Sequence, residues 1–264
     1  MKILFIGDII GKPGRKAVRE VIPRIISGRG IDLVIANCEN AAAGFGVTRE
    51  VVEELYQNNI DVLTSGNHLW DKKEVTEFIE DYETLLRPAN YPHGVPGRGT
   101  VIVPVPSGNY VGVLNLAGRI FMQPLDCPFR TAEREIERIR EKTPIIIVDI
   151  HAEATSEKRA LGWFLDGRVS AVLGTHTHVQ TADEDILPGG AAYITDVGMT
   201  GSFDSVIGIK KEIVLERFLT QMPNKFEVAK NDVRLQGVVV DVDEATGRST
   251  GIERLSVKMG GGII

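Results

Sequence analysis

Eight side chains of types that bind metal ions or transfer protons stand directly after short apolar runs of the sequence. They are Asp8, Glu39, Asn40, Asn67, His68, His151, His176 and His178. Carboxylate, carboxamide and imidazole groups suit manganese, iron, zinc or cobalt. A structural zinc takes only four ligands, so eight candidates predict a site for two ions bridged by one carboxylate.

The bridging carboxylate is predicted to be Glu39, because it lies at the middle of the series and Asp8 is the only other well-placed acid. His176 and His178 are two residues apart, and such residues face opposite ways in a regular strand. Both follow Gly174, where the strand should end. We therefore expect a bent backbone that directs each imidazole to a different ion.

His68 has a different predicted role, because it directly follows the candidate ligand Asn67. It should project into the same cavity without necessarily being a ligand, and a histidine near two cations and a phosphate is a good proton donor to a leaving oxygen. Asp71 is placed to orient its ring by hydrogen bonding. His93 lies in a Pro/Gly loop and matches no motif, so we expect it to be solvated.

The elements that must position these side chains are predicted from the apolar runs. Buried strands are expected over residues 2–7, 32–37, 61–65, 144–150 and 169–173. Parallel strands bring their C-terminal ends to one edge of a sheet, where ligands bind. Five strand ends would therefore deliver the eight side chains to one place.

Helices are expected between these strands. One helix is predicted to begin at Pro13, with Pro23 kinking or interrupting it. Thr48 should cap the next helix, and an Asp71/Glu74 capping box should open a third. Further helices are predicted to begin at Thr131, Ser156 and Lys210. The first half of the chain therefore alternates strand and helix.

The second half adds antiparallel strands. A hairpin is predicted for 99–105 and 110–116, and further strands for 191–195, 225–229, 235–242 and 252–257. The closing glycines Gly260–Gly262 are expected to fray. This order favours a mixed sheet, or two packed sheets with helices outside.

Composition indicates one domain over residues 1–264, since no Pro/Gly/Ser-rich linker divides the chain. The net charge of −6 argues against a nucleic-acid polymer as partner. A small anionic substrate is compatible with it, because bound cations reverse the local field. Two cysteines suggest no disulfide framework, and no apolar run is long enough for a signal peptide or a membrane span. These features predict a cytoplasmic protein without a membrane partner.

The order and spacing of the motifs resemble the calcineurin-like metallophosphoesterases along most of the chain. The matching motifs are Gly7-Asp8, Glu39-Asn40, Gly66-Asn67-His68, His151 and Gly174-Thr175-His176-Thr177-His178. Two positions depart from the common pattern: Ile10 stands where histidine is usual, and Glu39 where aspartate is usual. Both departures, with Asn40, are similar to the bacterial branch called YmdB. The stretches 151–158 and 195–201 are similar to that branch as well. Cys38 stands where that branch usually has glycine.

The resemblance implies a four-layer α/β sandwich, with two packed mixed β-sheets flanked by helices. It implies a 2′,3′-cyclic-nucleotide 2′-phosphodiesterase that forms 3′-nucleotides by attack of a dimetal-bound hydroxide. It also implies a homo-oligomer and two divalent or trivalent ions, iron or manganese. The implied ligands are Asp8, Glu39, Asn40 and His178 for one ion and Glu39, Asn67, His151 and His176 for the other, with His68 as proton donor.

Three other functions are compatible with the motifs. The first is another hydrolase of the superfamily, such as a nucleotidase or a phosphatase of monoesters, since a metal pair serves all of these. The second is a metal-bearing regulatory module with weak turnover. The third is a metal-free structural domain, for which the clustered histidines would be a coincidence.

Overall fold

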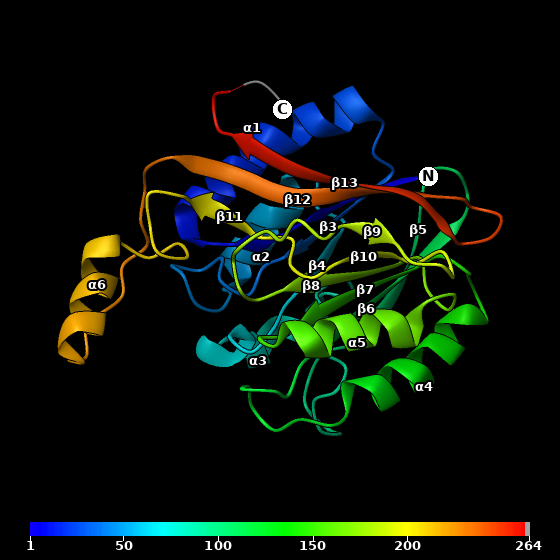
Figure 1. The fold of residues 1–264 in the computed structure, drawn as a ribbon, viewed down its shortest axis with the longest axis horizontal. Coiled ribbons are helices and arrows are strands. Elements are labelled where there is room, and N and C mark those ends of the chain that lie inside the picture. The colour runs from blue at the N-terminus through cyan, green and yellow to red at the C-terminus, as the bar shows by residue number, and fades with distance from the viewer. Residues whose placement is uncertain (262–264) are drawn as a thin grey trace.

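A computed structural model describes residues 1–261, in which two β-sheets pack on each other between helices (Figure 1). The seven-stranded sheet, called the first sheet, has the order β2-β11-β12-β1-β3-β4, and β13 also pairs with β12. Its strands are β1 (Lys2–Ile6), β2 (Asp8–Ile9), β3 (Leu33–Asn37), β4 (Val62–Thr64), β11 (Met199–Ser202), β12 (Val233–Val242) and β13 (Ser249–Lys258). Gly262, the last residue of the predicted frayed end, lies outside the described residues.

The six-stranded sheet, called the second sheet, has the order β5-β6-β7-β8-β10-β9. Its strands are β5 (Thr100–Pro104), β6 (Tyr110–Ala117), β7 (Ile146–His151), β8 (Ala171–Thr175), β9 (Asp185–Ile186) and β10 (Ala192–Ile194). Parallel pairing joins β6, β7, β8 and β10 here, and β1, β3 and β4 in the first sheet. Antiparallel pairs flank both groups, so both sheets are mixed, which confirms the predicted fold class.

Both faces of each sheet are covered, which explains why the strands read as unbroken apolar runs. In β1, Ile3 and Phe5 pack between the sheets, whereas Leu4 and Ile6 pack against the helices. This alternation follows from the two-residue repeat of a strand. A sheet with two buried faces needs apolar side chains at every position.

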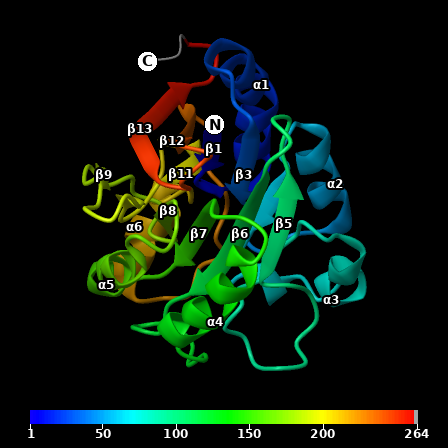
Figure 2. The ribbon, with the colours of Figure 1, turned by 90° about the vertical axis from the view of Figure 1, so that its right-hand side faces the viewer.

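Helices form the two outer layers (Figure 2). The helices are α1 (Gly11–Arg29), α2 (Arg49–Gln57), α3 (Val75–Phe78), α4 (Pro128–Arg140), α5 (Thr155–Leu165) and α6 (Lys211–Thr220), with short 3-10 turns η1 (Leu69–Asp71) and η2 (Ile79–Asp81). Apolar residues of α1 and α2 join the core of the first sheet, and those of α4 and α5 join the core of the second. Helix α6 projects from the body (Figure 1). Within residues 1–261, no helix has the length and apolarity needed to cross a bilayer.

The helix starts were predicted with mixed success. Thr48 does cap α2, since its hydroxyl accepts a hydrogen bond from the Val51 backbone N–H at 3.3 Å. The capping box at Asp71 was wrong, because the Asp71 carboxylate binds the ring of His68 and ends η1 instead of starting a helix. Helix α4 begins at Pro128, three residues before the predicted Thr131.

Two further expectations about local structure need correction. Pro23 does not interrupt helix α1, because Ile22 and Ile25 on either side are buried against the first sheet and this packing offsets the lost hydrogen bond. A kink at Pro23 stays a prediction. Residues 225–229 form a single bridge, Val228 to Ile209, and no strand. The predicted single domain stays a prediction.

Candidate metal centre

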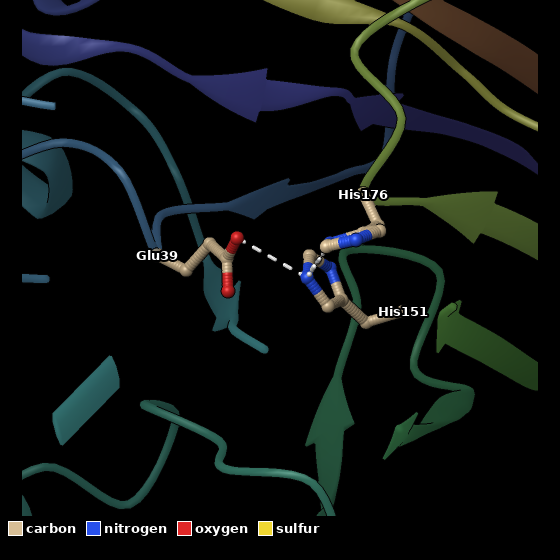
Figure 3. A group of neighbouring side chains, drawn as sticks. All are labelled: Glu39, His151 and His176. Atoms are coloured by element: carbon tan, nitrogen blue, oxygen red, sulfur yellow. Dashed lines mark hydrogen bonds and ion pairs between the residues drawn. The ribbon is translucent and has the colours of Figure 1, made fainter. Parts of the chain in front are cut away.

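The predicted site residues come together from the strand ends of both sheets. Two groups have ligand atoms that all lie within 4.8 Å of one another: Glu39 with His151 and His176, and Asp8 with Glu39 and His178. Glu39 belongs to both groups, which is the arrangement expected of a bridging carboxylate. Figure 3 shows Glu39 on one side of the first group, facing the rings of His151 and His176.

Nε2 of His151 is the centre of the first group. It lies 3.1 Å from Glu39 Oε1 and 3.0 Å from His176 Nδ1 (Figure 3). It also lies 3.1 Å from Asn67 Oδ1. One ring nitrogen carries at most one proton, so hydrogen bonding satisfies only one of these three contacts. A cation bound by the same atoms would satisfy them all.

The second group and the neighbouring Asn40 contain buried oxygen atoms without partners. Asp8 Oδ1 and Asn40 Oδ1 have no hydrogen-bond partner within residues 1–261. Asp8 Oδ1 lies 3.9 Å from His178 Nε2, and the Asn40 amide meets the same nitrogen through Nδ2 at 3.1 Å. Buried polar atoms are nearly always paired, so the unpaired Asp8 Oδ1 near the His178 ring fits a cation site.

Gly66 keeps space open beside the first group. A Cβ atom at this position would lie 2.1 Å from His151 Cδ2 and 2.4 Å from Glu39 Oε2. Any side chain here would occupy the space between these two ligand candidates. Glycine is therefore required at this position of the Gly66-Asn67-His68 motif, because the His151 ring and the Glu39 carboxylate come too close for a side chain.

In His178 and His151, a hydrogen bond at Nδ1 leaves Nε2 available to bind a metal ion. His178 Nδ1 donates to the Ile207 carbonyl at 2.9 Å. The Thr175 hydroxyl donates to Asp149 Oδ1 at 2.8 Å, so His151 Nδ1 must donate to Thr175 Oγ1 at 2.9 Å. Such outer hydrogen bonds orient the ring and fix the tautomer of metal-binding histidines.

The backbone after β8 is bent as predicted. His176 and His178 have φ values of 101° and 64°. The bend is held by Asp196 Oδ2, which accepts hydrogen bonds from the Thr177 N–H at 3.0 Å and the Thr177 hydroxyl at 2.8 Å. Lys158 Nζ donates to the same oxygen at 2.8 Å, and both side chains of this ion pair are fully buried.

The sequence left several supporting residues unassigned. From sequence alone, Asp196 is as compatible with a role in a turn as with support of a metal ligand, and Lys158, Thr175 and Ile207 carry no functional pattern as single residues. Lys158 and Asp196 lie in stretches, 151–158 and 195–201, that resemble the YmdB branch. A buried charge requires a partner. These two stretches were therefore the part of the sequence from which the Lys158–Asp196 pair could have been inferred.

Charge–charge interactions in the cluster shift the pKa values strongly. Burial lowers the pKa of His151, but Glu39 and Asp8 raise it more, to about 9. Burial raises the pKa of Glu39, but the opposing effects of His151 and His68 together are larger and bring it to about 2. Burial and the charge of His151 lower the pKa of His176 to about 3. The Glu39 carboxylate and the His151 ring therefore favour each other's charged form.

His68 lines the adjoining cavity, which has a volume of about 330 Å³. Its Nδ1 lies 2.8 Å from Asp71 Oδ2, which confirms the expected orienting contact. The side chain is 32% exposed, and Phe45 packs edge-to-face on its ring at 5.0 Å. With Nδ1 engaged, Nε2 is the nitrogen left to exchange a proton. His93 is exposed, as predicted.

Two packed mixed sheets with carboxylate, amide and imidazole groups gathered at their strand ends define a calcineurin-like fold. The chain belongs to the YmdB-like protein family, whose sequence model matches residues 4–255. The predicted family is thereby confirmed.

Relatives of known name or structure are similar over nearly the whole chain. A Bacillus subtilis protein named 2′,3′-cyclic-nucleotide 2′-phosphodiesterase is 50% identical over 97% of this chain and 97% of its own. A crystal structure of a hypothetical protein from Thermus thermophilus is 46% identical, with a TM-score of 0.92 over 98% of this chain and 100% of that one. A crystal structure of a novel phosphatase from Mycoplasma pneumoniae is 34% identical, with a TM-score of 0.91 over 98% of this chain and 93% of that one. The predicted enzyme class agrees with the name of the first relative.

Proposed function

We propose that this protein is a metal-dependent phosphodiesterase that hydrolyses 2′,3′-cyclic nucleotides, such as 2′,3′-cyclic AMP, to 3′-nucleotides. The observation that carries the proposal is the pair of ligand groups sharing Glu39 next to an Asp71-oriented His68. The name of the Bacillus subtilis relative supports the substrate.

Two ions would be held by the residues of the two groups. Asp8, Glu39, Asn40 and His178 would hold one ion, and Glu39, Asn67, His151 and His176 the other. Mixed oxygen and nitrogen donors without thiolate suit iron or manganese. When bound, such cations make water a nucleophile at neutral pH and neutralise the phosphate charge in the transition state.

The residues of the chain supply the proton transfer. In the reaction, water adds to phosphorus, the bond from phosphorus to the 2′ oxygen breaks, and the 3′ ester remains. The departing 2′ oxygen needs a proton, and we assign its donor as Nε2 of His68. Asp71 holds Nδ1 and stabilises the protonated ring, as carboxylates do for catalytic histidines.

A monoester phosphatase is the second candidate function, favoured by the description of the Mycoplasma pneumoniae structure as a novel phosphatase. Parallel assays of 2′,3′-cyclic AMP, 3′,5′-cyclic AMP and AMP separate the two. We expect turnover of the first compound to exceed that of the other two. Faster release of phosphate from AMP would favour the second function. The cytoplasmic location, the homo-oligomer and the absence of a nucleic-acid partner stay predictions.

A further inference from the structure

The cavity beside His68 has an apolar side that the metal chemistry does not use. We call it the apolar wall. It consists of Ile10, Phe45, Ile207, Ile209 and Phe226. The remaining lining residues are Gly44, Glu153, Thr177 and five of the predicted site residues: Glu39, Asn40, His68, His176 and His178. The lining is thus divided between polar residues at the metal centre and an apolar surface.

Three residues of the wall, Ile207, Ile209 and Phe226, come from two paired segments on either side of α6. The Lys210 N–H donates to the Glu227 carbonyl, and the Ala229 N–H donates to the Gly208 carbonyl, both at 2.9 Å. Val228 between them packs on Gly44, where a Cβ would lie 3.0 Å from Val228 Cγ2. The segment carrying Phe226 is therefore fastened to the body next to the site.

Ile207 joins the wall to the metal centre. Its side chain is 49% exposed, and its φ of 47° lies in the left-handed region, which a β-branched residue rarely adopts. Its carbonyl is the acceptor for His178 Nδ1. Ile207 thus combines a strained backbone with two roles: it orients the ligand candidate His178 and it lines the cavity. Backbone strain of this kind concentrates at ligand sites.

Phe226 supplies an aromatic surface in the wall. The Arg217 guanidinium packs on its ring at 4.9 Å from the centroid. This contact restrains a ring that borders the cavity. An aromatic ring restrained in this way can serve as a platform for a planar ligand.

We propose that the apolar wall binds the nucleobase of the substrate, with Phe226 as the stacking platform. The inference rests on the proposed function, since a phosphate at the histidines places the rest of the nucleotide in the same cavity. Bases stack on aromatic side chains regardless of sequence, because every base has a π face. The wall has no hydrogen-bonding side chain to read a base edge, so purine and pyrimidine substrates should have similar KM values.

The test compares a substrate that has a base with one that lacks it. In Phe226→Ala, KM for 2′,3′-cyclic AMP should rise about tenfold, equivalent to about 1.4 kcal/mol of binding. KM for glycerol 1,2-cyclic phosphate, a cyclic diester without a base, should not change. kcat and metal content should stay as in the unmodified protein. The stacking contact would bind substrate and transition state equally, so its loss raises KM alone.

Two further variants provide matched controls. Phe226→Trp keeps an aromatic face and should retain the low KM. Phe218→Ala removes the same side chain from a site on α6 that is 73% exposed and outside the cavity lining. It should leave both KM values unchanged. An equal rise for both substrates in Phe226→Ala, or no rise for either, would overturn the proposal.

Binding of 3′-AMP, measured by calorimetry, separates this inference from the proposed function. The unmodified protein should bind 3′-AMP about tenfold more tightly than Phe226→Ala, with equal affinity of both for inorganic phosphate. Equal affinities for 3′-AMP would refute the wall as a base site. If Phe226→Ala does not fold, the unmodified protein decides: 3′-AMP binding no tighter than phosphate binding also refutes it. Absence of turnover on both diesters would instead count against the proposed function.

Discussion

His68 differs from the three other clustered histidines because its ring makes no hydrogen bond or ion pair with a metal-ligand candidate among the described residues. Its Nδ1 is held by Asp71 at 2.8 Å. The rings of His151, His176 and His178 contact other ligand candidates, and His176 Nε2 also lies 3.2 Å from Glu153 Oε2. This difference in contacts supports the proposed division between proton transfer and metal binding.

Replacing His68 with alanine should reduce kcat about 10²- to 10⁴-fold, the usual contribution of a general acid. Both ions should remain bound, because no ring atom of His68 belongs to either ligand group. Steady-state kinetics and elemental analysis of the same preparation measure the two effects. His93→Ala, in an exposed loop, is the matched control and should behave as the unmodified protein. Loss of both metals in His68→Ala would contradict the donor role.

Replacing the two buried acids should change metal content in different ways. Glu39→Ala removes the shared ligand and should leave the protein without either ion, whereas Asp8→Ala should lose the ion of the second group. Elemental analysis of protein purified without chelators gives the stoichiometry. Asp71→Ala is the control and should keep its metals. Full metal content in Glu39→Ala would rule out the bridging assignment.

At the scale of elements, the segment after β8 depends on contacts with distant parts of the chain. Lys158 comes from α5, and Asp196 from the connection between β10 and β11. Together they hold Thr177 between two histidines with positive φ. The strained segment is thus positioned by a buried ion pair.

Lys158→Met should lower the free energy of unfolding by about 3–5 kcal/mol, because it leaves the buried Asp196 carboxylate without its partner. Urea denaturation followed by circular dichroism measures the change. Lys16→Met, in a half-exposed pair with Glu20 on α1, should cost no more than about 0.5 kcal/mol. Equal stability of the two variants would mean that the buried pair contributes little to the fold.

The buried central strands were predictable from sequence, whereas the short strands β2, β9 and β11 and several helix starts were not. β1, β3 and β7 are buried on both faces, so their apolar runs carry an unambiguous signal. Asp71 resembles a helix cap in sequence, but its carboxylate is used by His68. Local patterns cannot show that a distant or functional group competes for a side chain.

At the scale of the whole molecule, the site lies where the two sheets meet. Asp8, Glu39 and Asn67 follow strands of the first sheet, and His151 and His176 lie at the ends of strands of the second. The sequence predicted that these strand ends converge. It did not show how the strands divide between two sheets, because pairing between distant strands leaves no local pattern.

Because the proposed ligands come from both sheets, bound metal should stabilise the packing of the sheets on each other. Removing metal with a chelator should abolish activity and lower Tm, and manganese should restore both. Ligand at 100 times its Kd contributes about 2.7 kcal/mol, or roughly 5–10 °C for a chain of this size. Thermal unfolding with and without manganese measures the shift. Glu39→Ala should show no shift, and an equal shift there would indicate metal binding elsewhere.

The most direct test of the account is the identity of the product formed from 2′,3′-cyclic AMP by the metal-loaded protein. Chromatography that separates 3′-AMP from 2′-AMP, run beside His68→Ala at equal metal content, makes the measurement. The account predicts 3′-AMP as the product, formed at least about 100-fold more slowly by the variant. Formation of 2′-AMP, or no turnover by metal-loaded protein, would contradict it.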